Sequence, residues 1–61
     1  PGWAMAARVM ADLRRSLPGG QARMAVLKNI ARHPSFERLA VDNDEAGLRA
    51  LIEDELRRMS A

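Results

Sequence analysis

The stretch DNDEAGLRALIEDELRRMS, residues 42–60, decides the fold. Apolar residues recur at three- and four-residue steps from Leu48 to Met59, and charged residues fill the positions between them. This spacing is typical of an amphipathic helix. Asp42 is placed to cap the helix, and Glu45 is placed to reach back as in a capping box. We therefore predict a C-terminal amphipathic helix over residues 42–60.

Two further amphipathic helices precede this one, and residues 1–33 are expected to form a helical hairpin. In the first helix the apolar residues follow a heptad-like spacing through Trp3, Ala6, Met10, Leu13 and Leu17. The sequence Pro18-Gly19-Gly20 predicts its end, because glycine adopts the left-handed C′ conformation and proline does not continue a helix.

The second helix is predicted over Gln21–Arg32. It ends before Pro34, because the residue that precedes a proline is pushed out of the α region. The apolar face expected for this helix consists of Met24, Leu27, Ile30 and Ala31, with Val26 at its edge.

A short helix is expected within residues 34–41, from Phe36 to Val41. Ser35 is a candidate cap for it, and we expect Phe36, Leu39 and Ala40 to be buried. With only two aromatic residues and few β-branched ones, the composition disfavours strands and favours helices. The predicted fold class is all-α, a single domain over residues 1–61. We expect a small bundle of three amphipathic helices plus a short fourth, and a dimeric four-helix bundle is an alternative arrangement.

The size of the chain argues against catalysis. Ordering 61 residues costs roughly 90 kcal/mol at about 1.5 kcal/mol per residue, which a core of this size barely offsets. Without cysteine, neither disulfides nor a Cys-based zinc site stabilises the fold. A chain this short cannot wall a large active-site pocket. No apolar run spans a bilayer, so we expect a cytoplasmic protein without a membrane partner.

No residue pattern predicts a catalytic, metal or cofactor site. His33, the only histidine, lacks a second imidazole or thiol and is expected to lie at a helix end. Asp42, Asp44, Gly47 and Glu53 match four positions of a calcium loop, but alanines replace two oxygen ligands. The neighbouring acids of residues 53–55 diverge by about 100° per residue on a helix and cannot act on one atom.

Charge is divided between the two halves of the chain. Residues 1–38 carry seven Lys or Arg and two acids, whereas residues 39–61 carry three Arg and six acids. The basic half suggests an alternative function, a small DNA-binding domain that uses the first two helices. The acids in the first turn of the C-terminal helix disfavour that alternative, because they would repel a duplex.

The amphipathic faces favour a non-catalytic interaction module over an enzyme. Two copies of the hairpin would bury their apolar faces as a four-helix bundle, a homodimer. The C-terminal helix would then engage another protein subunit, or alternatively pack on its own hairpin and complete a monomeric three-helix core. The residues predicted for self-association are Trp3, Met10, Leu13, Leu17, Met24, Leu27 and Ile30.

Residues 44–56, DEAGLRALIEDEL, resemble the docking helix that closes the C-terminal docking domains of modular polyketide synthases. In that bacterial family two upstream helices dimerise and the last helix engages the next subunit. The resemblance implies apolar contacts at Leu48, Leu51, Ile52 and Leu56, to which the helical pattern adds Met59. It implies charged selectivity positions at Asp44, Glu45, Glu53 and Glu55.

Overall fold

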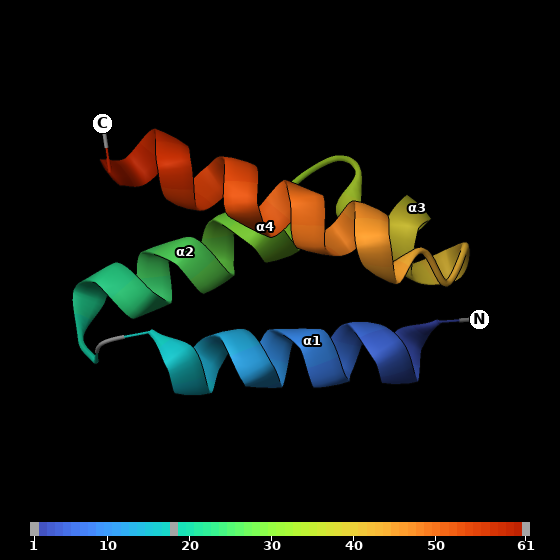
Figure 1. Ribbon diagram of the computed structural model, residues 1–61, viewed down its shortest axis with the longest axis horizontal. Helices are drawn as coiled ribbons and strands as arrows, with labels where there is room; N and C mark the ends of the chain where they lie inside the picture. The colour runs from blue at the N-terminus through green and yellow to red at the C-terminus, as the bar shows by residue number, and fades with distance from the viewer. Residues whose placement is uncertain (1, 18, 61) are drawn as a thin grey trace.

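The computed structural model describes residues 2–17 and 19–60, and these residues form helices joined by short turns. The helices are α1 (Trp3–Ser16), α2 (Gln21–Arg32), α3 (Phe36–Val41) and α4 (Glu45–Ser60) (Figure 1). The all-α prediction is confirmed, and α2 and α3 have the predicted bounds. The expected turn residue Pro18 and the domain ends Pro1 and Ala61 lie outside the described residues.

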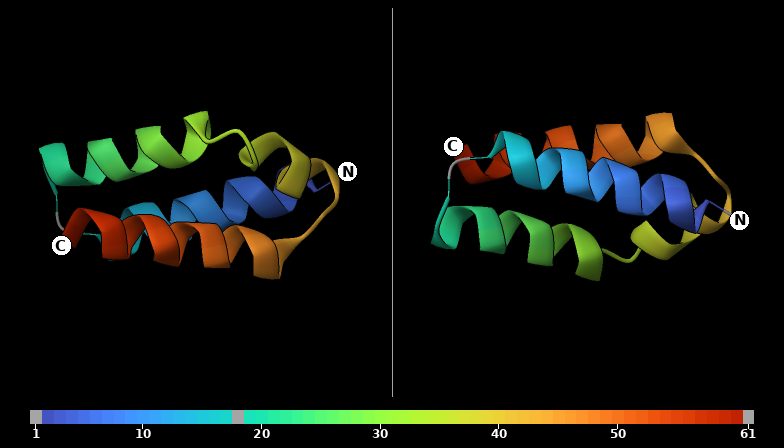
Figure 2. Two further views of the ribbon diagram at one scale, coloured as in Figure 1. Left: turned by 90° about the horizontal axis from the view of Figure 1, so that it is seen from above. Right: turned by 90° about the horizontal axis from the view of Figure 1, so that it is seen from below.

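The three long helices form an up-down-up bundle. α1 and α4 run side by side in the same direction, and α2 runs in the opposite direction (Figure 1). The views from above and below in Figure 2 show that α2 lies behind α1 and α4 as they are seen in Figure 1. The short helix α3 covers the end of the bundle where α1 begins. Every pair of helices is in contact. Each helix therefore buries part of its surface against three others.

The core lies where the three long helices meet and extends under α3. Ile30, Ala40 and Leu48 are fully covered, one from each of α2, α3 and α4. The remaining buried apolar residues are Met5, Ala6, Val9, Leu13, Val26 and Ile52. This set joins all four helices into one contiguous core.

The buried face of α1 is wider than the predicted one. Met5 and Val9 are buried although they lie beside the predicted row, and Trp3 is 48% exposed. Trp3 packs instead against Phe36 of α3, with 6.4 Å between the ring centroids and 59° between the ring planes. A heptad-like row describes contact with one neighbour, whereas α1 contacts three helices and buries a broader arc.

The buried face of α2 is rotated from the predicted one. Val26 and Ile30 are buried, but Met24 is 61% exposed and Ala31 is exposed. Val26 and Ile30 are four residues apart and therefore lie one turn apart on one side of the helix. Packing against α4 and α1 selects this side and leaves Met24 in solvent.

The turn between α3 and α4 differs from the predicted capping. Asn43 has φ 55°, and its N–H donates to Ala40 O at 3.1 Å while the N–H of Asp44 donates to Leu39 O at 2.9 Å. These two bonds form a Schellman motif that ends α3. Asp44, and not Asp42, then caps α4: its Oδ1 accepts the N–H of Gly47 at 2.9 Å.

Two glycines lie at positions of close approach. A Cβ on Gly47 would lie 2.5 Å from Asp44 Oδ2 and 2.7 Å from Leu39 Cδ2, so the ends of these two side chains would have to shift to admit it. A Cβ on Gly2 would lie 2.5 Å from Ala40 O. The N–H of Gly2 donates to that same oxygen at 2.8 Å, which fixes the start of α1 on α3.

Candidate functional site

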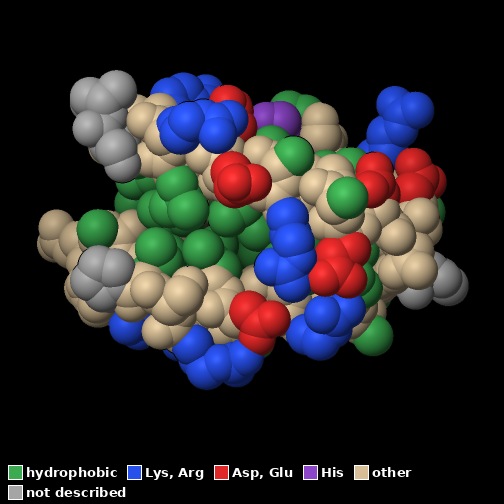
Figure 3. All heavy atoms as spheres, viewed as in Figure 1, with side chains coloured by type: hydrophobic (Ala, Val, Ile, Leu, Met, Phe, Trp, Pro, Cys, Tyr) green, Lys and Arg blue, Asp and Glu red, His purple; other side chains and the backbone are tan. Residues whose placement is uncertain are grey.

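A groove runs between α1 and α4 on the face opposite α2. Its floor is apolar and consists of Val9 and Leu13 from α1 and Ile52 from α4. Polar residues form the rims, Asp12 and Ser16 on α1 and Arg49 and Glu53 on α4. The hollow has a volume of about 320 Å³. Figure 3 shows apolar side chains gathered in this hollow, with charged residues around it. We call it the α1–α4 groove.

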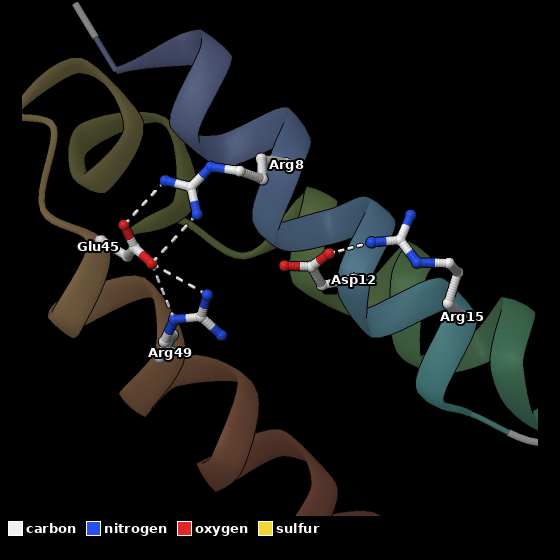
Figure 4. Close-up of polar contacts among 5 residues, drawn as sticks. All are labelled: Arg8, Asp12, Arg15, Glu45 and Arg49. Carbon is white, nitrogen blue, oxygen red and sulfur yellow. Dashed lines mark hydrogen bonds and ion pairs between the residues drawn. The ribbon is translucent and has the colours of Figure 1, made fainter.

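Three charged side chains bridge the two helices beside the groove. Glu45 lies between Arg8 of α1 and Arg49 of α4 (Figure 4). The carboxylate accepts from Arg8 Nη2 at 3.0 Å and from Arg49 Nε and Nη2 at 3.0 and 2.9 Å. The hydrogen bond from Arg8, and then that from Arg49, lower the pKa of Glu45, and Glu45 in turn raises the pKa of Arg8. The triad ties α1 to α4 at the end where both helices begin.

This triad predicts a loss of stability in acid. A carboxyl with a lowered folded-state pKa stabilises the fold above its ordinary pKa, about 4.3, and loses that effect as the pH falls through the folded value. Wild type should therefore lose more stability than Glu45→Gln between about pH 5 and about pH 3. Urea unfolding at both pH values measures the difference. Glu37→Gln, which removes an exposed carboxyl outside the triad, should behave as wild type; identical pH dependence of all three chains would contradict the prediction.

The predicted apolar contacts of the C-terminal helix lie mostly in the chain's own core. Leu48 is fully buried and Ile52 is 6% exposed, so neither is free to enter a partner. Leu51 and Leu56 are partly buried and pack against the core. Met59 alone is exposed, at 42%, beside Asn29 of α2. The interpretation of this row as a free docking surface is wrong for the folded chain, because the helix needs the row to pack on α1, α2 and α3.

Three of the four predicted acidic selectivity positions have structural roles. Asp44 caps α4, and Glu45 belongs to the triad. Glu55 is only 6% exposed; it accepts from Asn29 Nδ2 at 3.0 Å and pairs with Arg58. Glu53 is exposed on the rim of the α1–α4 groove, and the described contacts give it no ion-pair partner. Of the four acids, Glu53 is the one available to a partner.

The residues predicted for self-association do not form one exposed face. Leu13 and Ile30 belong to the core. Exposed side chains remain at Trp3 and Met24, which come from different helices. The partly buried members of the set, which pack against the core, are Met10, Leu17 and Leu27. The hairpin of α1 and α2 therefore has no continuous apolar stripe left over, because α4 covers it.

Most of the groove was not predicted from the sequence. No role was expected for Val9, Asp12, Ser16 or Arg49. A signal was present in the sequence: Val9, Asp12, Leu13 and Ser16 are spaced i, i+3, i+4 and i+7, which puts them on one side of a helix. That spacing could not identify the helix on the far side of the groove.

Within residues 2–17 and 19–60, no group of three or more His, Cys, Asp or Glu side chains is placed to hold a metal ion. His33 is the C-cap of α2, as predicted for a helix end, and its Nδ1 accepts the N–H of Ser35 at 3.1 Å. Among the helices described, none is long and apolar enough to cross a membrane.

Comparison with known proteins adds no relative. The sequence matches no family model, and no curated protein or solved structure is significantly similar to it.

Proposed function

We propose that the chain is a non-catalytic protein–protein interaction module that binds a helix of another polypeptide in the α1–α4 groove. The observation that carries the proposal is the hollow between α1 and α4, which has polar rims and lies over the almost completely buried core residues Val9, Leu13 and Ile52. An apolar centre within a polar rim is the usual anatomy of a protein interface. Grooves of this kind accept amphipathic helices, which insert an apolar face between two helices.

The bundle has a position for such a helix. In a four-helix bundle each helix contacts two neighbours around a common core. Here α2 lies against both α1 and α4 on one side (Figures 1 and 2). The groove lies between the same two helices on the other side (Figure 3). A helix in the groove occupies the fourth position. The minimum for a specific interface, about 500 Å² from each partner, is about an eighth of the chain's 4189 Å² of accessible surface.

The rims favour a partner with basic flanks over a second copy of this chain. Asp12 lies on one rim and Glu53 on the other. Asp12 already pairs with Arg15, and the rim cation Arg49 pairs with Glu45, so Glu53 is, among the residues described, the rim charge left for a partner. A second copy would offer Glu53 the same rim, in which the cation is already paired, whereas a basic flank offers a free cation. A lysine or arginine beside the apolar residues of a partner helix pairs with Glu53 instead. Homodimerisation and the resemblance to polyketide synthase docking domains stay predictions. Of the charged selectivity positions that the resemblance implies, the proposal uses one, Glu53.

The test uses a synthetic amphipathic helix with a leucine row and lysine flanks, and a scrambled peptide of the same composition. Titration of the isotopically labelled chain should shift the backbone amide resonances of the groove residues, and the scrambled peptide should shift few of them. Glu53→Lys should weaken binding by on the order of tenfold, because it places like charges together. Glu37→Lys makes the same charge change on α3 and should bind as wild type.

Three results would contradict the proposal: shifts that map outside the groove, equal affinity for both peptides, or equal losses in the two variants. Light scattering on the chain alone completes the test. A monomer at high concentration agrees with a partner helix, whereas a dimer whose contacts map to the groove would replace that partner with a second copy.

A further inference from the structure

Within residues 2–17 and 19–60, four cations have no carboxylate within ion-pair distance. Ion pairs within 4 Å engage the six other basic residues, on α1, α3 and α4. The four without a carboxylate are Arg14, Arg23, Lys28 and Arg32. Arg14 is in the last turn of α1, and the other three are on α2, a helix without any acidic residue. The surplus positive charge is therefore concentrated around α2.

Three of these cations line an open hollow of about 570 Å³ at the junction of α1 and α2. Arg14, Arg23 and Lys28 share its wall with Met24 and Ala25. Met24 is the most exposed of the large apolar side chains in the described part of the chain. Met24, Lys28 and Arg32 follow one another at four-residue steps, so cations continue along the same side of α2 beyond the hollow. We call this surface the cationic hollow.

Arg23 is held in place but is not saturated. Its Nη2 donates to Leu17 O at 3.1 Å, which anchors the guanidinium to the end of α1. Its Nε is a buried donor without a hydrogen-bond partner in the described structure. Because that atom is buried, it is not itself a contact for a ligand; Arg23 contributes a fixed positive charge to the wall of the hollow. A fixed guanidinium also loses little conformational entropy when it binds a carboxylate.

We propose that the cationic hollow binds an acidic peptide segment that carries one apolar side chain. The carboxylates pair with the cations that line the hollow, Arg14, Arg23 and Lys28, and the apolar side chain covers Met24. Arg32 extends the positive charge beyond the hollow. Charge complementarity supplies the attraction, and exclusion of water from Met24 adds a contribution that a purely ionic surface lacks. Nucleic acid fits less well, because a phosphate backbone makes no use of the exposed Met24 beside the cations.

Among the described residues, the cationic hollow shares no lining residue with the α1–α4 groove. The variants that test the hollow leave Glu53 unchanged, so a negative result for one site does not contradict the proposal for the other. The probe is a fluorescent peptide of about eight glutamates with one central leucine; an all-glutamate peptide and a short DNA duplex are the competitors. Fluorescence anisotropy at about 20 and about 200 mM salt measures affinity, and binding should weaken with salt because the charges are exposed. Lys28→Glu and Arg14→Glu should each weaken binding by on the order of tenfold.

Two further variants give the test its specificity. Arg38→Glu makes the same charge change on α3, at the other end of the bundle, and should bind as wild type. Met24→Gln should weaken the leucine peptide and leave the all-glutamate peptide unchanged. Circular dichroism checks that each variant folds. The proposal is overturned if the leucine peptide does not bind, or if Arg38→Glu loses as much affinity for it as Lys28→Glu. It is also overturned if the DNA duplex binds more tightly than the peptide and Met24→Gln has no effect on peptide binding. The last result would favour the DNA-binding alternative predicted from the basic half.

Discussion

Ile52→Asp is expected to unfold the isolated chain. Ile52 is 6% exposed and belongs to the core. Loss of a large buried apolar side chain costs about 2–5 kcal/mol, and an unpaired carboxylate in its place adds a desolvation penalty. The whole chain is expected to be stable by only about 3–9 kcal/mol at about 0.05–0.15 kcal/mol per residue. Far-UV circular dichroism should show the loss of helix, and the cooperative thermal transition should disappear.

Two companions separate this effect from a general effect of the substitution. Ile52→Leu keeps the apolar volume and should cost less than about 1.5 kcal/mol. Ala50→Asp introduces the same carboxylate on the exposed side of α4 and should cost at most about 1 kcal/mol of helix propensity. A helical, cooperatively melting Ile52→Asp chain would show that α4 does not need this residue, and would restore the row of α4 as a free binding surface.

Gly2→Ala is expected to destabilise the fold by about 1–3 kcal/mol, the usual range for overpacking. The added methyl would lie 2.5 Å from Ala40 O and 2.6 Å from Asn43 Cα, both backbone atoms that cannot rotate away. Relief requires the start of α1 to move off α3, which also breaks the hydrogen bond from the N–H of Gly2 to Ala40 O. In a domain of this size each 1 kcal/mol lowers the midpoint of thermal unfolding by about 4–8 °C.

Gly19→Ala is the matched control. Among the residues that the structure describes, a Cβ at Gly19 would meet Arg23 Nη2 alone, at 3.6 Å, which is ordinary contact. The substitution should therefore be neutral or stabilise by up to about 1 kcal/mol, because alanine restricts the unfolded chain. If Gly2→Ala and Gly19→Ala unfold at the same temperature, the start of α1 is not packed on α3 as described.

The helix bounds could be predicted because local chemistry sets them. Pro34 ends α2 through its effect on the preceding residue, and the resulting bounds of α2 and α3 agree with the structure. The start of α4 was predicted three residues too early, at Asp42. Asp42 and Asp44 are equivalent as caps in a sequence pattern, and the choice depends on the left-handed conformation of Asn43 between them.

The rotation of each helix about its own axis could not be predicted. Alanine-rich helices such as α2 have two candidate faces, one with Met24 and one with Val26, and only the neighbouring helices decide between them. The groove depends on the same information. Glu53 was identified as a contact residue from a resemblance, but its proximity to Leu13 across the groove arises from the packing of α1 on α4.

Because α1 and α4 run in the same direction, their peptide dipoles also point the same way. Each contributes about half a negative charge at its C-terminal end, and these ends lie at the same end of the molecule. A partner helix that runs antiparallel to α1 and α4 in the groove would place its positive N-terminal end beside these two negative ends. A parallel partner helix would place a third negative end there. Reversing the order of residues in a peptide that binds the groove should therefore lower its affinity, even when the pattern of its side chains is kept.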